Sequence, residues 1–135
     1  MKIKIWSDGA ARGNPGPAGA GALLEDAAGK TLAELSEYLG ETTNNIAEYR
    51  ALEIALREAL RRGARQAEIF LDSELVVRQL LGLYRVRQPH LLPLFSSVQQ
   101  LLQKLSCFSI QHIPREQNRR ADQLAKRAID GHFGK

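Results

Sequence analysis

Four carboxylic acids occupy positions in this sequence where side chains can do chemistry. Asp8 follows a predicted first strand and directly precedes a glycine-rich turn, and Asp72 follows a later predicted strand and directly precedes a helix. Glu48 lies near the start of the first predicted helix, and Asp122 lies early in the last one. In an open α/β sheet, ligand sites collect at strand ends, near the point where the strand order reverses. All four acids can reach that end of the sheet.

Each acid also has a structural explanation. Asp72 can cap the helix that follows it, and Asp8 can accept a hydrogen bond within its own turn. Glu48 and Asp122 can be solvated acids in a first helical turn, where the helix dipole favours negative charge. For each acid taken singly the structural explanation is favoured, and only the convergence of all four favours a shared site.

Converging carboxylates repel one another unless a cation lies between them. Oxygen ligands without histidine or cysteine suit Mg²⁺ or Mn²⁺. Two such ions about 3.5–4 Å apart clamp the attacking and leaving oxygens of an in-line phosphoryl displacement. The four acids therefore indicate a metal-dependent reaction at a phosphate.

The spacing of apolar residues predicts an α/β fold, with elements in the order three strands, helix, strand, two helices, strand, helix. The first strands form an antiparallel start and the later ones are reached by helical crossovers, which gives a mixed sheet. Right-handed crossovers place helices on both faces of that sheet. The predicted strands cover residues 2–7, 19–25, 31–39, 66–71 and 107–113, and the predicted helices cover 47–60, 73–81, 91–105 and 121–129.

Length and composition favour a single globular domain over residues 1–135, in which residues 131–135 are expected to fray. Nineteen Lys and Arg against fifteen Asp and Glu give a net charge of +4, which is compatible with a polyanionic partner but does not require one. The single cysteine excludes an intramolecular disulfide, and no apolar run approaches membrane-spanning length. We therefore expect a cytoplasmic monomer without a membrane partner.

Four runs of residues resemble the motifs of a known family. They occur in the order that the family has, and they span nearly the whole chain, which makes the match specific. The runs are SDGAARGNPGP at 7–17, TTNNIAE at 42–48, LDS at 71–73 and NRRADQLA at 118–125. On these motifs the chain resembles type 1 ribonuclease H.

The resemblance implies the ribonuclease H fold, which is a five-stranded mixed sheet flanked by helices. It implies an endoribonuclease that hydrolyses the RNA strand of RNA–DNA hybrids and leaves 5′-phosphate and 3′-hydroxyl ends. It also implies Mg²⁺ as the cofactor, with Mn²⁺ as a substitute and two ions per site in the substrate complex. The implied catalytic acids and metal ligands are Asp8, Glu48, Asp72 and Asp122.

The resemblance also places substrate contacts on two polar turns. Asparagine amides and exposed N–H groups can bond ribose 2′-hydroxyls and phosphates, and the 2′-hydroxyl distinguishes RNA from DNA. Glu48 is expected to serve both as a metal ligand and as an acceptor for a 2′-hydroxyl. The expected substrate-binding residues are Gly9, Arg12, Asn14, Thr43, Asn44, Asn45 and Glu48.

One departure from the family concerns the binding of substrate. Many bacterial members insert a basic, Trp-bearing protrusion after the third motif. Here residues 80–94 hold only Arg85 and Arg87 as basic residues and contain no Trp. We expect a member without the protrusion, whose binding of a nucleic acid is weaker and more sensitive to salt.

Another departure concerns the loop before the fourth motif, where many members carry a catalytic histidine. Residues 114–118 contain no histidine, and Arg115 is the cation in that loop. His112 lies close by but falls in a predicted strand. We expect Arg115 to take the catalytic position, with His112 as the alternative. Glu41 also stands where some members have a basic residue near a phosphate contact.

Two other functions remain open from the sequence. A non-catalytic nucleic-acid-binding module of the same fold is expected to lack at least one of the carboxylates, and none is missing. Another metal-dependent nuclease or nucleotidyl transferase of this fold would keep the acids. The run TTNN before Glu48 favours readout of a 2′-hydroxyl and hence a ribonuclease H.

Overall fold

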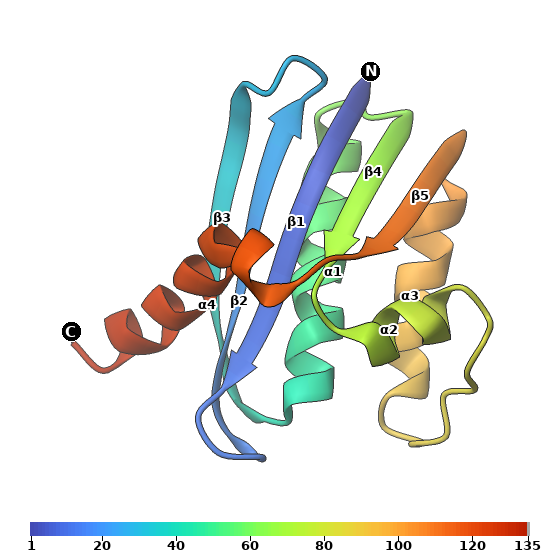
Figure 1. Cartoon of the computed structure of the whole chain (residues 1–135). Helices are drawn as coiled ribbons and strands as arrows, with labels where there is room; N and C mark the ends of the chain where they lie inside the picture. The colour runs from blue at the N-terminus through green and yellow to red at the C-terminus, as the bar shows by residue number, and fades with distance from the viewer. Residues whose placement is uncertain (135) are drawn as a thin grey trace.

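The computed structural model describes residues 1–134, and its centre is one five-stranded sheet (Figure 1). β1 is antiparallel to β2, and β2 is antiparallel to β3, whereas β4 and β5 run parallel to β1. The mixed sheet expected from the sequence is therefore confirmed. The strands are β1 (Lys2–Ala11), β2 (Gly16–Asp26), β3 (Thr31–Thr42), β4 (Gln66–Leu71) and β5 (Cys107–His112), in the spatial order β3-β2-β1-β4-β5.

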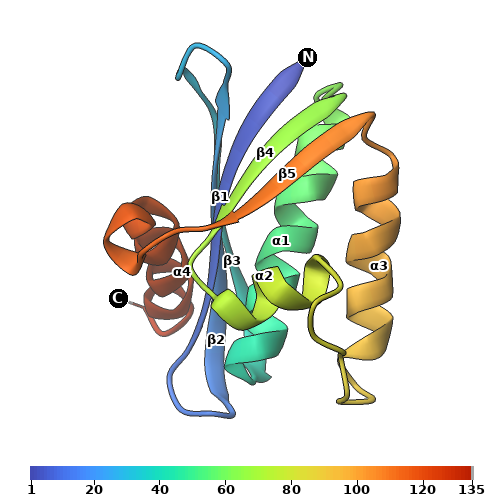
Figure 2. The same ribbon diagram turned by 45° about the vertical axis from the view of Figure 1, so that its right-hand side comes forward.

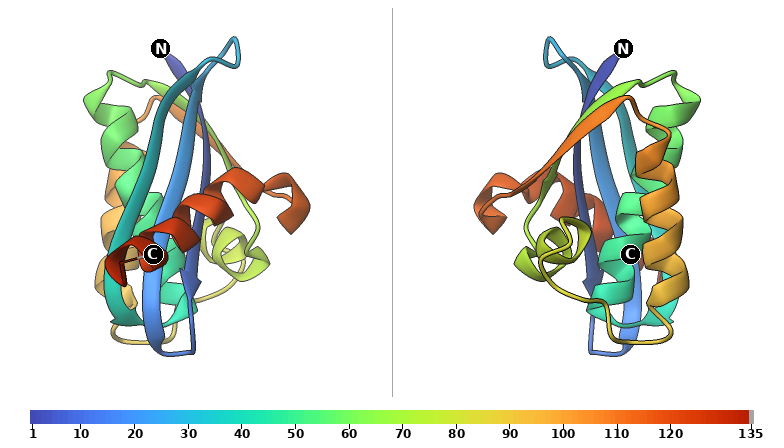
Figure 3. Two further views of the ribbon diagram at one scale, coloured as in Figure 1. Left: turned by 90° about the vertical axis from the view of Figure 1, so that its left-hand side faces the viewer. Right: turned by 90° about the vertical axis from the view of Figure 1, so that its right-hand side faces the viewer.

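Helices cover both faces of the sheet, as predicted. Figure 2 shows α1 and α3 on one side of the sheet and α4 on the other. α4 crosses its face of the sheet over β1, β2 and β3 (Figure 3). Within residues 1–134, no helix is both long enough and apolar enough to cross a membrane. The helices are α1 (Asn44–Arg61), α2 (Glu74–Leu80), α3 (Leu92–Gln103) and α4 (Arg119–His132), and a short 3₁₀ helix (Arg115–Gln117) precedes α4.

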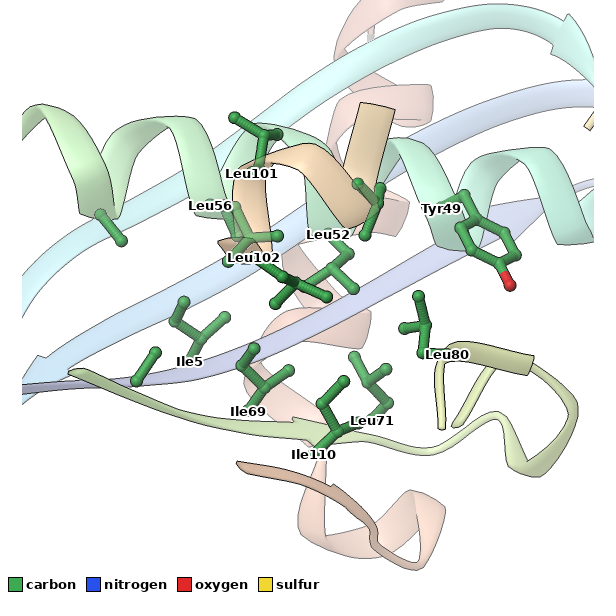
Figure 4. Packing of buried hydrophobic residues seen from close by; sticks show 14 of the residues in the cluster. Ile5, Tyr49, Leu52, Leu56, Ile69, Leu71, Leu80, Leu101, Leu102 and Ile110 are labelled. Atoms are coloured by element: carbon green, nitrogen blue, oxygen red, sulfur yellow. The ribbon is translucent and has the colours of Figure 1, made fainter. Parts of the chain in front are cut away.

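The main core lies between the sheet and the helices α1 and α3. Ile5 of β1 and Ile69 of β4 meet Leu52 and Leu56 of α1, and all four side chains are fully buried (Figure 4). Burial of one such side chain stabilises the fold by roughly 1.5–3 kcal/mol. The buried face of α1 consists of alanines, leucines and a tyrosine at helical spacing, which explains why this segment is an amphipathic helix.

The first two strands are longer than predicted. β1 continues to Ala11 and β2 begins at Gly16, so the turn between them is reduced to residues 12–15. The prediction ended β1 at residue 7 because the small residues that follow show no alternation of apolar and polar side chains. Asp8 was expected to follow the end of β1, and it lies within the strand instead.

The end of the chain is also more regular than predicted. α4 continues through Gly131 and His132, and the His132 ring stacks on Tyr38 of β3 with ring centroids 3.8 Å apart. Phe133 packs edge-on against the same tyrosine. The expected fraying of residues 131–135 stays a prediction, and Lys135 lies outside the described residues.

Candidate active site

Three acids from three separate elements meet beside β1. Asp8 lies in β1, Glu48 near the start of α1, and Asp72 directly after β4. Each offers a carboxylate oxygen, and these oxygens all lie within 4.8 Å of one another. The structure thus brings together three of the four acids whose convergence the sequence predicts.

The strand pairing explains why these acids meet. β1 pairs with β4 only as far as Trp6 and Phe70, whereas β1 stays paired with β2 up to Ala11. The two parallel strands therefore separate just before Asp8 and Asp72. This is also where the strand order reverses, because β2 and β3 lie on one side of β1 and β4 and β5 lie on the other. Such a point is the common ligand site of an α/β sheet.

Gly9 allows Glu48 to reach the cluster. A Cβ atom at position 9 would overlap the backbone of Ala47 and Glu48, so the start of α1 can rest directly on β1 only above a glycine. The Gly9 N–H also donates a hydrogen bond to the Glu48 carboxylate. Gly9 was expected as a substrate contact. It does line the hollow beside the acids, and it holds α1 against β1 in addition.

The pKa values of Asp8 and Glu48 are raised, because both acids are buried close to other negative charges. Burial and the negative charges of Asp72 and Asp122 raise the pKa of Asp8 to about 7, although a hydrogen bond with Glu48 opposes this shift. Burial and the charge of Asp8 raise the pKa of Glu48 well above its usual value. A divalent cation between the acids relieves both effects, and a donor set of carboxylate oxygens alone suits a hard cation. The residues present therefore fit a metal ion such as Mg²⁺ or Mn²⁺.

Asp122 approaches the cluster from α4. α4 lies close to β2 here because Gly21 has no side chain to meet the Ala121 carbonyl. From the first turn of α4, Asp122 comes within hydrogen-bonding reach of Asp8. Its Oδ2 lies 3.0 Å from Lys126 Nζ, one helical turn further on. Asp122 already has a cationic partner and is the most peripheral of the four acids.

All four acids line one hollow of about 420 Å³. Arg115 of the 3₁₀ helix lines the same hollow. His112 is the exposed last residue of β5 and is not among the lining residues. The geometry favours Arg115 over His112 as the cation that acts in the hollow, while its catalytic role stays a prediction.

The two polar turns are tied together at the rim of the hollow. The Asn14 side-chain oxygen accepts a hydrogen bond from the Asn44 N–H at 3.1 Å, and the Asn44 side-chain oxygen accepts one from the Ala11 N–H at 3.0 Å. Asn44 and Asn45 both line the hollow. Within residues 1–134 the side-chain NH₂ groups of Asn14 and Asn44 make no hydrogen bond, so both can bind a ligand.

Two of the expected substrate-binding residues make contacts within the protein, and their binding of substrate stays a prediction. Thr43 Oγ1 accepts a hydrogen bond from the Ile46 N–H at 3.3 Å and so caps α1. The Arg12 guanidinium pairs with Asp130 of α4 at 2.6 Å and does not line the hollow. The reason is the extra length of β1, because four residues of extended chain after Asp8 place Arg12 roughly 13 Å further along the strand direction.

The sequence did not predict a role at the site for two side chains that the structure places there. Asn118, just before α4, donates a hydrogen bond to Asp72 Oδ2 at 3.1 Å. Lys126 lines the hollow and pairs with Asp122. Asn118 lies four residues before Asp122 and Lys126 four residues after it, so helical spacing around that acid was the signal that could have found them.

A five-stranded sheet of this order, with acids where β1 and β4 separate, defines a protein of the ribonuclease H fold. A family model described as reverse transcriptase-like matches residues 6–128. α2 and α3 are joined by residues 81–91 without a further helix, so the inserted protrusion is absent from this part of the chain. The chain belongs to the type 1 ribonuclease H family, among members that lack the protrusion.

Three relatives illustrate this membership. Bifunctional protein Rv2228c of Mycobacterium tuberculosis (strain ATCC 25618 / H37Rv) is 44% identical over 131 residues, which are 96% of this chain and 36% of that protein. RNase H1 from the halophilic archaeon Halobacterium salinarum NRC-1 has a TM-score of 0.94 and 40% identity, covering 97% of this chain and 99% of that one. LC11-RNase H1, solved in complex with an RNA/DNA hybrid, has a TM-score of 0.91 and 45% identity over 97% and 99% of the two chains. This chain thus spans about a third of the length of the mycobacterial relative.

Proposed function

We propose that this chain is an endoribonuclease that hydrolyses the RNA strand of RNA–DNA hybrids with divalent metal ions and leaves 5′-phosphate and 3′-hydroxyl ends. The observation that carries the proposal is the meeting of Asp8, Glu48 and Asp72 in a hollow that Asn44 and Asn45 also line. The acids provide a metal site, and the amides provide hydrogen-bonding groups for a ribose. The likeness to LC11-RNase H1, which was solved with an RNA/DNA hybrid, supports this substrate.

Mg²⁺ is the proposed cofactor, with Mn²⁺ as a substitute and two ions in the substrate complex. Asp8, Glu48 and Asp72 are the residues that hold the metal, and Asp122 completes the set from α4. When bound, a pair of such ions clamps the attacking and leaving oxygens of the phosphoryl displacement. Since burial raises the pKa values of Asp8 and Glu48, metal binding to this pair should release protons, and metal affinity should increase with pH.

The selection of RNA is proposed to rest on the 2′-hydroxyl. The NH₂ groups of Asn14 and Asn44 can donate hydrogen bonds to this hydroxyl or to a phosphate, as can Asn45. Glu48 can accept a hydrogen bond from the hydroxyl. Once a bound substrate covers these groups, a donor or acceptor left unpaired costs about 1–3 kcal/mol, so several of them together discriminate strongly against deoxyribose.

Arg115 is proposed to hold the scissile or departing phosphate. Arginine as a residue type does not exchange protons with reacting groups at working pH, so a role in proton transfer is not proposed. The planar guanidinium does offer paired donors that match phosphate oxygens. Its place in the hollow with the four acids supports this role.

A cleavage assay tests the proposed function. Labelled RNA–DNA hybrid, RNA–RNA, DNA–DNA and single-stranded RNA are incubated with the protein in Mg²⁺ or in chelator, with Asp8→Asn as the control for a contaminating nuclease. We expect cleavage of the hybrid only in the presence of metal. In a duplex whose cut strand is DNA with a short run of ribonucleotides, cuts should be confined to that run. Cuts in the all-deoxy stretches would show a general nuclease, and binding without cleavage would show a non-catalytic module.

A further inference from the structure

Asn118 lies where several parts of the site meet. The residue is only 1% exposed, although it stands between the 3₁₀ helix and α4. Its Nδ2 donates to the Ser7 carbonyl oxygen at 2.9 Å and to Asp72 Oδ2 at 3.1 Å. Ser7 directly precedes Asp8. One amide group therefore joins the strand that carries Asp8 to the carboxylate of Asp72.

The backbone of Asn118 makes two further links. Its N–H donates to the Arg115 carbonyl oxygen at 2.9 Å, and its own carbonyl accepts a hydrogen bond from the Asp122 N–H at 3.1 Å. These bonds connect the turn that carries Arg115 to the first turn of α4. Since they are made by the backbone, alanine or leucine at position 118 keeps them. Only the two side-chain bonds require asparagine.

The orientation of the Asn118 amide follows from its partners. The Ser7 carbonyl and the Asp72 carboxylate are both acceptors, so the NH₂ group, and not the oxygen, must face them. The Asn118 Oδ1 is buried and has no hydrogen-bond partner within residues 1–134. A buried carbonyl without a partner is unfavourable. Packing alone therefore does not favour asparagine here, whereas the need for an uncharged donor beside Asp72 does.

We propose that Asn118 is a positioning residue that fixes the Asp72 carboxylate for metal binding. Asp72 follows the end of β4, beyond the last residue pair that β4 forms with β5. The hydrogen bond to Oδ2 restrains the carboxylate and leaves lone pairs for a cation. Because the amide is neutral, it does not compete with that cation as a lysine or an arginine would. This inference rests on the metal-dependent function proposed above.

The test measures metal affinity in the protein without substrate. Asn118→Ala removes the amide, and Asn118→Leu removes the donor while keeping the branching and the number of side-chain heavy atoms. Isothermal titration calorimetry with Mn²⁺ should show an affinity loss of about 10–100-fold in both variants, the range found when partners of metal ligands are removed. In hybrid cleavage, the metal concentration for half-maximal rate should rise by a similar factor, while the rate at saturating metal falls less.

Ser36→Ala is the matched control. Ser36 Oγ donates to the Leu124 carbonyl at 2.6 Å and so ties β3 to α4 without touching an acid. This variant should lower thermal stability and leave metal affinity unchanged. If the Asn118 variants bind metal like the wild type, or if Ser36→Ala loses as much affinity as they do, Asn118 only docks α4 and the positioning role is wrong.

One result would contradict the proposed function without deciding the role of Asn118. A wild-type protein that binds metal but does not cut hybrid would overturn that function. In that case the crystal structure of Asn118→Leu still decides the inference. A changed Asp72 carboxylate orientation upholds the positioning role, and an unchanged one overturns it.

Discussion

β1 and β4 contribute to two neighbouring regions, the apolar core under α1 and the acid cluster. Burial of side chains stabilises the fold in the first region and destabilises it in the second. Between the sheet and α1, aliphatic residues such as Leu56 and Ile69 are fully buried, which favours folding. Where β1 and β4 separate, Asp8 is only 6% exposed and its pKa is raised to about 7, so its burial as an anion opposes folding. Stability and chemistry thus come from different residues, and mutations should be able to change one without the other.

The largest expected effect is the loss of activity when a carboxylate leaves the cluster. Asp8→Asn, Glu48→Gln and Asp72→Asn should each reduce hybrid cleavage at saturating Mg²⁺ nearly to background, because the amide keeps the shape of the ligand but not its charge. The free energy of unfolding of the metal-free protein should stay the same or rise, since one like charge is removed. Single-turnover cleavage and urea unfolding measure the two effects. Wild-type activity in any one variant would remove that residue from the site.

Asp122→Asn should be milder than Asp8→Asn. Asp122 is paired with Lys126 and lies outside the close group of three acids, so water can partly replace it as a ligand. The same single-turnover assay should show a residual rate clearly above that of Asp8→Asn. Equally complete loss in both variants would show that Asp122 is as central as the other acids.

A change in the core should have the opposite outcome. Leu56→Ala is expected to lower the free energy of unfolding by about 2–5 kcal/mol, because a fully buried side chain leaves a cavity. The metal affinity of the folded molecules should remain that of the wild type. Urea unfolding and calorimetric metal titration, both below the unfolding transition, test the contrast. A large loss of metal affinity would mean that the core and the acid cluster are coupled.

The raised pKa of Asp8 predicts how the stability of the metal-free protein depends on pH. In the folded protein the pKa of Asp8 is raised to about 7 and that of its neighbour Glu48 is raised as well, whereas an aspartate in the unfolded chain titrates near 3.8. Between these values the folded state binds more protons, so the free energy of unfolding should fall as the pH rises through this window.

Urea unfolding in chelator across the pH range measures this dependence, with Asp8→Asn as the control. The stability difference between variant and wild type should grow in favour of the variant as the pH rises. Divalent metal should restore the stability of the wild type at high pH. If the difference in the free energy of unfolding between variant and wild type does not change with pH, the pKa of Asp8 is not raised in the folded protein.

Local patterns predicted the order of the elements and the meeting of the acids, because apolar spacing and short motifs are both properties of neighbouring residues. The length of β1 was missed since its last residues are small. The partner of Asn118 could not be predicted, because its bond to Ser7 joins residues 111 positions apart. The stacking of His132 on Tyr38 likewise depends on how α4 crosses the sheet.

The smallest predicted effect separates the two candidate cations beside the cluster. Arg115→Ala should slow turnover about 10-fold or more, as expected when a hydrogen bond to a charged group worth about 1.5–3 kcal/mol is lost. His112→Ala should have little effect, because His112 is exposed at the end of β5 and does not line the hollow. Arg119→Ala, which removes an exposed arginine outside the hollow, is the matched control for the loss of charge.

The pH profile of these variants decides which side chain acts and how. Arginine stays protonated, so Arg115→Ala should lower the rate at every pH and leave the shape of the profile unchanged. A histidine that exchanges protons with the reacting groups would instead contribute a titration near neutral pH, which its removal would flatten. Multiple-turnover rates across pH at fixed metal concentration distinguish the two. If His112→Ala lowers the rate more than Arg115→Ala does and flattens the pH profile, then His112 must move from the end of β5 into the hollow, and Arg115 has no catalytic role.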